Sequence, residues 1–283
     1  MISDEIKSEI AIEMDFIDKV FPGTQPVSLD YTNISNISND YVVSLKYDGI
    51  RKMLYSKNKK TFLFDRKYCS ESSDILFTNE LTILDGEEVN KMFIIFDCIV
   101  INGINVKNFT LNERMEKLKS FIIQSGISLK LKTFYPICDF DAMIKIKDIP
   151  HDGYVFTNIK NIYKAGRDES LYKYKDGKQN TIDFACFRNQ DAYELYCGEL
   201  GRDVIWIGYA LNKHNLELSG EKSIVECYWD DSSYSWVMKN ERKDKNNAND
   251  IKIVRWNIRT IENNIDLNDL IQIIRQRAGS RCL

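Results

Sequence analysis

Apolar residues recur at helical spacing in three stretches of the chain. A capping box formed by Thr110 and Glu113 predicts a helix that follows it, and Asp266 is the expected N-cap of a last helix. The remaining helix should cover residues 2–20 as an amphipathic element. Its apolar face would consist of Ile2, Ile6, Ile10, Met14, Ile17 and Val20.

Other stretches have the pattern of strands. Residues 41–45 and 93–100 are apolar enough for buried strands, and residues 61–66 predict a strand that ends in a charged pair. Residues 21–29 contain two prolines and a glycine, so we expect an extended segment without regular structure. Residues 84–89 place a glycine among carboxylates, which in isolation is typical of an exposed turn.

From residue 184 onward, short β-like runs alternate with polar turns. Their count and spacing favour an OB-fold barrel. The five runs are 184–187, 193–197, 204–210, 223–229 and 235–238. We therefore predict an α+β protein with a first domain over residues 1–184, a barrel over 185–260, and a helical segment over 261–283 that packs back on the first domain.

Composition narrows the class of protein. The 283 residues, 43% of them hydrophobic, can bury a core and are enough for two domains. A net charge of -3 argues against coating nucleic acid through a broad basic surface, although a short contact with one RNA end remains open. Seven cysteines without a C-x-x-C pair and only two histidines argue against a disulfide frame or a zinc site. An acidic N-terminus and the lack of an apolar run of about 18 residues predict an intracellular protein without a membrane span.

The candidate chemistry centres on the stretch from Lys46 to Arg51, which reads K-Y-D-G-I-R and follows a predicted buried strand. A lysine amine held in a tight turn becomes a nucleophile when desolvation and a nearby cation such as Arg51 disfavour its protonated form. The alternative is a hairpin whose turn is Asp48-Gly49, with Lys46 and Arg51 as solvated neighbours.

This pattern resembles the nucleophile motif of the lysine nucleotidyltransferases, the superfamily of mRNA capping guanylyltransferases and polynucleotide ligases. The resemblance covers residues 21 to 275 and implies a ligase-type, ATP-grasp-like adenylation fold of antiparallel sheets and helices before the OB-fold barrel. The P-G-x-x-P-V-S segment at 22–28 is similar to capping guanylyltransferases rather than to ligases. The pattern as a whole is closest to compact enzymes of large DNA viruses such as chlorella viruses. The other matching motifs, in order, are D-G-E at 85–87, F-D at 96–97, D-G-x-V-F at 152–156, K-x-K at 173–175 and R-x-D-K-x-x-x-N at 242–249.

The resemblance assigns a role to each motif residue. The implied catalytic residues are Lys46, Lys173, Lys175, Arg242, Asp244 and Lys245. The implied GTP-binding residues are Arg51, Arg66, Glu87, Phe96, Lys132 and Asp152, with Phe93 as the alternative to Phe96 and Asp152 also as a metal ligand. Within this set Glu87 would contact the ribose, Phe96 would stack on the purine, and Lys132 would donate to guanine O6. Lys173 and Lys175, on one face of a strand, would hold the α-phosphate between them.

The implied reaction has two steps, with Mg²⁺ or Mn²⁺ as cofactor. Lys46 attacks the α-phosphorus of GTP and expels pyrophosphate, and the lysyl-GMP then passes to RNA with a 5'-diphosphate end. Arg242 and Lys245 would act on the β- and γ-phosphates. The sequence has no phosphatase H-C-x5-R loop, no E-x-E-x-E metal tunnel and no glycine-rich methyl-donor loop. The resemblance leaves a separate RNA triphosphatase and a cap methyltransferase open as partners, and the expected location is a nucleus or a viral factory. Two alternatives stay open, an ATP-dependent polynucleotide ligase and a non-catalytic nucleotide- or RNA-binding subunit.

Overall fold

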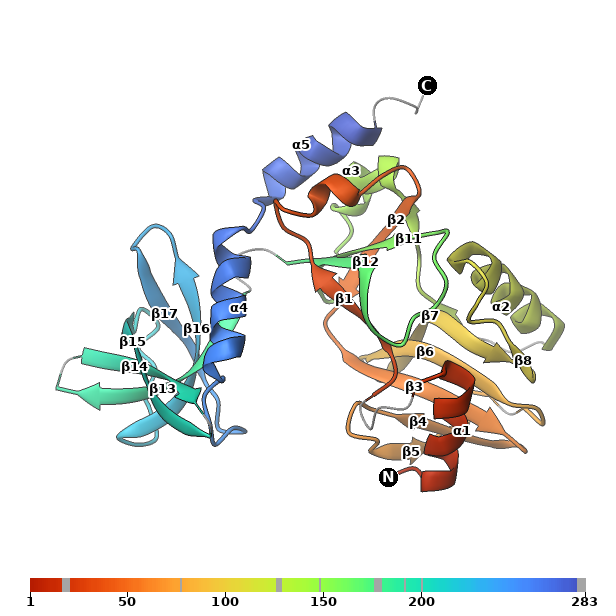
Figure 1. Ribbon diagram of the computed structural model, residues 1–283, viewed down its shortest axis with the longest axis horizontal. Helices are drawn as coiled ribbons and strands as arrows, with labels where there is room; N and C mark the ends of the chain where they lie inside the picture. The colour runs from red at the N-terminus through yellow and green to blue at the C-terminus, as the bar shows by residue number, and fades with distance from the viewer. Residues whose placement is uncertain are drawn as a thin grey trace. The chain divides into compact units, whose positions relative to one another are not determined.

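The computed structural model describes residues 1–16, 21–76, 78–125, 129–147, 149–175, 180–190, 192–199 and 201–278. The chain divides into two compact units (Figure 1). The first consists of Met1–Leu29, Ser35–Tyr174 and Ile271–Leu283, and the second of Asp30–Ile34 and Lys175–Leu270. The mixture of helices and largely antiparallel sheets confirms the predicted α+β class.

The first unit contains a five-stranded sheet in the order β1-β12-β11-β2-β10. Within it β1 pairs with β12 in parallel, whereas the other neighbours are antiparallel. The strands are β1 (Thr24–Ser28), β2 (Tyr41–Tyr47), β10 (Tyr135–Pro136), β11 (His151–Asn158) and β12 (Gly166–Tyr174). The short helices η1 (Ile34–Asn36), η2 (Ile137–Asp139) and α3 (Phe140–Met143) complete this part of the chain.

A seven-stranded sheet forms the other half of the first unit, in the order β5-β4-β3-β6-β7-β8 with β9 paired to β7. Its strands are β3 (Ile50–Lys57), β4 (Lys60–Phe64), β5 (Ser70–Ser72), β6 (Thr82–Val89), β7 (Met92–Ile101), β8 (Ile104–Asn105) and β9 (Lys130–Leu131). Alternate residues of each strand face opposite sides of the sheet, so each side has its own apolar core.

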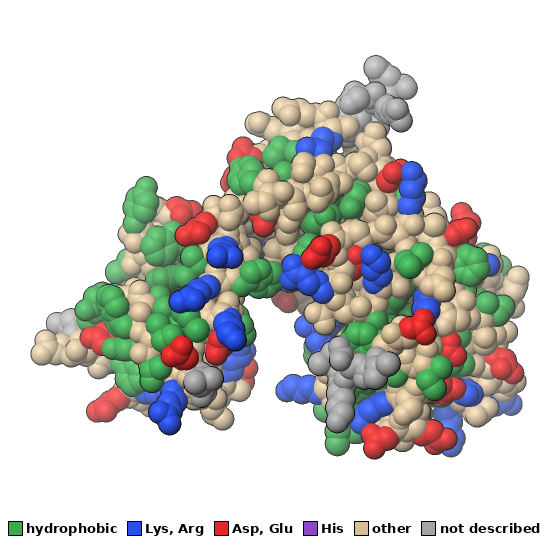
Figure 2. Space-filling view, in the orientation of Figure 1, with side chains coloured by type: hydrophobic (Ala, Val, Ile, Leu, Met, Phe, Trp, Pro, Cys, Tyr) green, Lys and Arg blue, Asp and Glu red, His purple; other side chains and the backbone are tan. Residues whose placement is uncertain are grey.

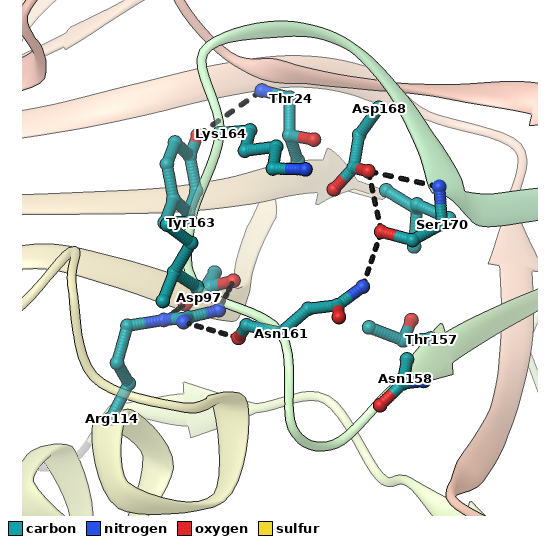
Figure 3. Close-up of a pocket in the computed structure, with 12 residues that line it drawn as sticks. Thr24, Asp97, Arg114, Thr157, Asn158, Asn161, Tyr163, Lys164, Asp168 and Ser170 are labelled. Carbon is teal, nitrogen blue, oxygen red and sulfur yellow. Dashed lines mark hydrogen bonds and ion pairs between the residues drawn. The ribbon is translucent and has the colours of Figure 1, made fainter.

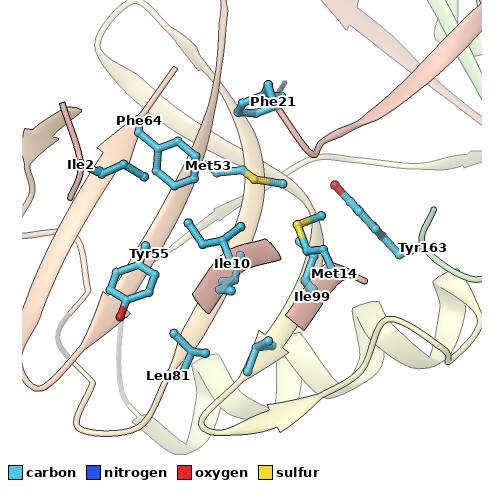
Figure 4. Packing of buried hydrophobic residues seen from close by; sticks show 12 residues of the cluster. Ile2, Ile10, Met14, Phe21, Met53, Tyr55, Phe64, Leu81, Ile99 and Tyr163 are labelled. Atoms are coloured by element: carbon cyan, nitrogen blue, oxygen red, sulfur yellow. The ribbon is translucent and has the colours of Figure 1, made fainter. Parts of the chain in front are cut away.

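Each of those sides is covered by a helix. On one side Ile10 and Met14 of α1 (Asp4–Met14) pack against Met53 and Ile99 (Figure 4). On the other, α2 (Leu111–Ser125) buries its apolar stripe. The capping box is confirmed, because the Thr110 backbone N–H donates to Glu113 Oε2 at 2.8 Å.

Three predictions for the first unit are wrong in detail. The first helix ends at Met14, because Asp15 adopts a left-handed conformation with φ 48°, and the predicted Ile17 and Val20 lie outside the described residues. Residues 24–28 do form a strand, since β1 lies at the sheet edge and its register shifts at Pro26, where a ladder donor is missing. Residues 84–89 are not an exposed turn but the interior of β6, paired on both sides.

The second unit is a closed barrel in the order β13-β14-β15-β17-β16, which agrees with the predicted OB-fold. Its strands are β13 (Thr181–Asn189), β14 (Ala192–Glu199), β15 (Arg202–Leu211), β16 (Lys222–Asp230) and β17 (Ser235–Glu241). The predicted boundary at residue 184 falls inside β13, because that strand closes the barrel against β16.

Two helices follow the barrel. The sequence reading missed α4 (Ile251–Glu262), which begins after the N-cap Asp250 and buries Val254 in the barrel core. The expected last helix is α5 (Leu267–Ala278), and its residues from Ile271 group with the first unit. None of the helices in the described ranges has the length and apolarity that crossing a bilayer requires.

Candidate active site

Lys46 lies near the end of β2, where the chain passes from one sheet of the first unit to the other. The hairpin alternative is wrong, because β2 belongs to the five-stranded sheet and β3 to the seven-stranded sheet. The Asp48-Gly49 step makes this crossing against β6. A Cβ atom at Gly49 would lie 2.4 Å from the Glu88 carbonyl oxygen, so only glycine fits there.

The Lys46 amine makes an ion pair with Asp152 of β11. Lys46 Nζ lies 2.5 Å from Asp152 Oδ1, and both side chains keep about a fifth of their surface exposed, 23% and 19%. The pair is held by the register of β2 against β11, in which a bulge between His151 and Tyr154 shifts the strand next to Lys46. Asp152 is thus the group placed to exchange a proton with the amine.

The Arg51 side chain is held in place by a buried carboxylate. Its Nε donates to Asp85 Oδ1 at 3.0 Å and its Nη2 to Asp85 Oδ2 at 2.5 Å, while Nη1 donates to the Thr24 carbonyl oxygen. Burial opposes the charged guanidinium, but the Asp85 carboxylate outweighs that effect and raises the pKa of Arg51. Tyr163 completes the arrangement, since its hydroxyl donates to Asp85 Oδ2 at 2.5 Å.

Phe96 and Lys132 lie next to Arg51. The Phe96 ring is half-buried, with the Arg51 guanidinium 5.2 Å and Lys132 Nζ 5.4 Å from its centroid. Phe93, by contrast, is a buried core residue whose ring lies against Gly86. Of the two candidates for stacking on a purine, only Phe96 therefore offers a partly accessible ring.

Lys132 is buried at 8% exposure, and its ammonium also lies 5.0 Å from the Tyr47 ring centroid. Burial lowers the pKa of Lys132 to about 8, with Glu87 acting in the opposite direction. Burial likewise raises the pKa of Glu87, against the cationic Lys132, Lys46 and Arg51. Lys46, Arg51, Glu87, Lys132 and Asp152 therefore influence one another electrostatically, and the contacts of Arg51 and Lys132 with Phe96 place these two cations at the same ring.

We expect the contribution of Lys132 to stability to change with pH. Its folded-state pKa of about 8 lies below the roughly 10.4 of an unfolded chain, so the unfolded state binds more protons between these values and stability rises with pH. A Lys132→Met variant lacks this rise. In urea denaturation, the wild-type free energy of unfolding should therefore rise relative to that of the variant between about pH 7 and about pH 10. A difference independent of pH would contradict the lowered pKa.

Lys173 shares a face with Lys46. In the five-stranded sheet Lys173 pairs with Val155, and Val155 pairs with Ser44, two residues before Lys46 on the same side of β2. Strand β12 ends at Tyr174, so Lys175 lies one residue beyond the strand that was expected to present both lysines, and it groups with the second unit.

The remaining predicted residues do not join this site in the first unit. Arg66 follows β4 and is exposed. Arg242, Asp244 and Lys245 belong to the second unit, where Arg242 Nη1 donates to Asp183 Oδ1 at 3.1 Å and Lys245 also pairs with Asp183. Arg242 also binds Asp244 at 2.8 Å, a hydrogen bond that lowers the pKa of Asp244 to about 2.

The sequence reading missed a second buried ion pair beside Asp85. Asp97 of β7 is the partner of Asp85 across the β6–β7 ladder, and Arg114 of α2 binds both of its oxygens at 2.7 Å. The Arg114 guanidinium also lies 5.8 Å from the Tyr163 ring centroid. The available signal was a carboxylate inside each of two otherwise apolar strands, since a buried charge needs a partner.

Tyr163 also lines a separate polar pocket (Figure 3). Its hydroxyl accepts a hydrogen bond from the Thr24 backbone N–H at 3.3 Å, and Asp168 and Ser170 face it from the opposite side. Asp168 Oδ1 accepts from both the backbone N–H and the hydroxyl of Ser170, at 2.9 and 2.5 Å. These contacts fix β1 and the start of β12 around Tyr163, so the residue joins the pocket wall to the Asp85–Arg51 pair.

Comparisons with known proteins agree with this geometry. The family model of the mRNA capping enzyme catalytic domain matches residues 2–177, and that of the mRNA capping enzyme C-terminal domain matches residues 139–271. The chain is 27% identical to an mRNA-capping enzyme subunit alpha of Schizosaccharomyces pombe, over 98% of this chain and 86% of that protein. It is 28% identical to the mRNA-capping enzyme of Mus musculus, over 92% of this chain and 50% of that protein.

Among solved structures, a mycobacterial DNA ligase D complexed with ATP and MES shares the fold. Its TM-score is 0.52 at 12% identity, over 79% of this chain and 95% of the ligase chain. Closeness to the enzymes of large DNA viruses stays a prediction. The two family models together span most of the chain, and the chain therefore belongs to the mRNA capping enzyme family of guanylyltransferases.

Proposed function

We propose that this chain transfers GMP from GTP to the 5'-diphosphate end of RNA through a covalent bond to Lys46. The observation that carries the proposal is the 2.5 Å contact of Lys46 Nζ with Asp152 in a site that also holds Glu87, Lys132 and Phe96. A nucleophilic amine, a proton acceptor, a cation for the base edge and an accessible ring are the parts that this chemistry needs.

In the first step the Lys46 ammonium gives one proton to Asp152, its ion-pair partner, and the resulting neutral amine attacks the α-phosphorus of GTP. A phosphorus–nitrogen bond forms, the bond from that phosphorus to the bridging oxygen breaks, and pyrophosphate leaves with the bonding electrons. A second proton leaves Nζ as the phosphorus–nitrogen bond forms and passes to the departing pyrophosphate. In the second step a β-phosphate oxygen of the RNA end attacks the same phosphorus, and the amine departs with a proton returned to Nζ.

The carboxylates of the site suit a divalent cation. Burial is the main cause of the raised pKa of Glu87, and the negative charge of Asp152 adds to it. The parts of the chain that the structure describes contain no group of three or more histidine, cysteine, aspartate or glutamate side chains that could by themselves hold a metal ion. One or two carboxylates completed by substrate phosphates is the donor set that Mg²⁺ prefers, so Asp152 would hold Mg²⁺ or Mn²⁺. When bound, the ion would neutralise charge on the phosphates.

Base recognition falls to Phe96 and Lys132. A purine stacked on the accessible Phe96 ring would bring its edge towards Lys132, which lies 5.4 Å from that ring. A donor there favours guanine, which carries an oxygen at position 6, over adenine, which carries an amino group. Glu87 is then available for the ribose hydroxyls.

The test of the function is incubation with α-labelled GTP or ATP and a divalent ion, followed by denaturing electrophoresis. Label from GTP alone, transferable to diphosphate-ended RNA, supports the proposal. Label from ATP alone would favour the polynucleotide ligase, and no label from either nucleotide would favour a binding subunit.

We assign Arg242 and Lys245 to the leaving pyrophosphate, as the family motif implies. At that position the two cations would stabilise the negative charge that develops on the leaving pyrophosphate, and this charge develops in the first step only. A Lys245→Ala variant should therefore form the adduct about 100-fold more slowly, yet transfer GMP from a purified adduct to RNA at nearly the wild-type rate. Single-turnover rates of both steps measure this.

The competing role for Lys245 is structural, because it pairs with Asp183 in the barrel. In that case Lys245→Ala would lower barrel stability and leave the first step at the wild-type rate. Lys243→Ala is the matched control, since Lys243 belongs to the same loop but its side chain is 76% exposed.

For partners we propose a separate RNA triphosphatase and a cap methyltransferase, with action inside the cell in a nucleus or viral factory. Several fungal relatives are named subunit alpha of the capping enzyme, a name that implies further subunits in those proteins.

A further inference from the structure

The outer face of the barrel formed by β13, β14 and β15 carries aromatic rings that the proposed function does not use. Trp206 and Tyr209 of β15 are each 54% exposed, and their rings meet edge to face with centroids 5.8 Å apart. Large exposed rings in neighbouring positions of a sheet are typical of a binding surface. Hydrophobic side chains are plentiful on the barrel in Figure 2, where charged side chains stand among them.

Strand register brings two more rings to this face. Tyr196 of β14 pairs with Trp206, and its ring meets that of Phe187 of β13 edge to face at 5.2 Å. The residues between them along the strands, such as Leu195 and Cys186, point into the barrel core. We call Phe187, Tyr196, Trp206 and Tyr209 together the aromatic face.

A carboxylate lies at the centre of the aromatic face. In the strand register Glu194 is the partner of Phe187 on one side and of Tyr209 on the other. The Tyr196 hydroxyl donates a hydrogen bond to Glu194 Oε2 at 3.0 Å. Asn189 donates to Glu194 Oε1 at 3.1 Å. No lysine or arginine forms an ion pair with Glu194 among the described residues, although Lys222 lies near Phe187 and pairs with Asp203 instead.

We propose that the aromatic face is a docking surface for a segment of a partner protein that inserts a lysine or arginine side chain between these rings and against Glu194. The rings attract a cation through their electron-rich faces, and the carboxylate supplies the opposite charge. The surroundings favour a basic partner as well, because residues 180 to 270 contain eleven lysines and arginines but sixteen aspartates and glutamates.

Single-stranded RNA is the less suitable occupant. Aromatic platforms do bind bases, but the strand must bring its phosphates with it, and a positively charged groove normally holds them. Here the nearest charge in the middle of the platform is negative. A second copy of this chain is also a less suitable occupant, because it would have to present a cation without another partner to the same face.

The test uses the full chain labelled with ¹⁵N-tryptophan, which gives one indole signal for each of its four tryptophans. The probes are a short synthetic peptide with two arginines among serine and leucine, the same peptide with citrulline in place of arginine, and a single-stranded RNA of about ten nucleotides. Citrulline keeps the shape of arginine and removes its charge. We expect the arginine peptide to shift the Trp206 signal and to bind about fivefold more tightly than the citrulline peptide.

Three variants distinguish specific binding at the aromatic face from nonspecific binding of the peptide. Glu194→Gln should abolish the preference for arginine over citrulline, and Trp206→Ala should weaken binding of the arginine peptide about fivefold. Trp256→Ala is the matched control, because Trp256 is 45% exposed on α4 rather than on the sheet, and it should bind as wild type does.

The contrary outcomes are equally defined. Equal affinity for both peptides in wild type, or equal weakening by Trp256→Ala, would overturn the proposal. Tighter binding of the RNA at Trp206, or dimerisation that Trp206→Ala abolishes without any peptide, would replace it by another occupant. The wild-type signals decide these points even if a variant fails to fold, and adduct formation on Lys46 is measured separately, so failure of the proposed function is distinguishable.

Discussion

Lys46→Ala and Lys46→Arg should both abolish the covalent adduct formed from labelled GTP. Alanine has no nucleophile, and the guanidinium of arginine stays protonated at any pH that the protein tolerates. The wild-type adduct should be labile in acid and stable in base, as a phosphorus–nitrogen bond is. Denaturing electrophoresis after acid or base treatment measures both properties.

Lys160→Arg is the matched control for the lysine substitutions. Lys160 also belongs to the first unit and also pairs with an aspartate, Asp40 at 2.8 Å, but its side chain is 67% exposed. This variant should form the adduct at the wild-type level. An adduct that persists in either Lys46 variant, or that resists acid, would place the covalent chemistry on another residue.

Asp85→Asn should cost about 3–5 kcal/mol of folding free energy and also raise the GTP concentration needed for half-maximal adduct formation. The substitution leaves the buried Arg51 guanidinium without its charged partner, to which it makes two hydrogen bonds at 3.0 and 2.5 Å. Because Arg51 lies 5.2 Å from the Phe96 ring centroid, its release would also disturb the surface on which the purine stacks. Urea denaturation and initial rates of adduct formation measure the two effects.

The second buried pair of the same sheet provides the control for Asp85. Asp97→Asn breaks the bidentate contact with Arg114, at 2.7 Å for both bonds, and should cost similar stability. Arg114 otherwise donates to the carbonyl oxygens of Phe109 and Asn161 rather than towards Lys46, so the GTP dependence should stay as in wild type.

Tyr163→Phe offers a milder version of the same experiment. It removes only the hydroxyl that donates to Asp85 Oδ2 and should cost about 1–3 kcal/mol, so the variant folds even if Asp85→Asn does not. The variants Asp85→Asn, Asp97→Asn and Tyr163→Phe could all lower the free energy of unfolding and leave the GTP dependence of adduct formation unchanged. In that case Asp85 would have a purely structural role.

The sequence determined the local elements where a regular pattern coincided with burial. The run at 93–100 is a strand because apolar residues suit both faces of a central strand, and the capping box at Thr110 begins a helix because it satisfies that helix's free backbone groups. The five β-like runs and the motif residues Lys46, Glu87, Phe96, Lys132 and Asp152 could likewise be selected from the sequence alone. Periodicity and motif spacing are local properties, and these predictions required nothing else.

Only the tertiary structure decided which of these residues meet. The segment that contains two prolines forms the edge strand β1 because β12 lies beside it. The carboxylates at 84–89 lie inside β6 because β3 and β7 pair with that strand on both sides. Asp85 and Asp97 are opposite one another in the β6–β7 ladder, yet their arginines come from β3 and α2. Such partners are separated along the chain by 34 and 17 residues, and strand register and helix packing, not local propensity, bring their charges within hydrogen-bond distance.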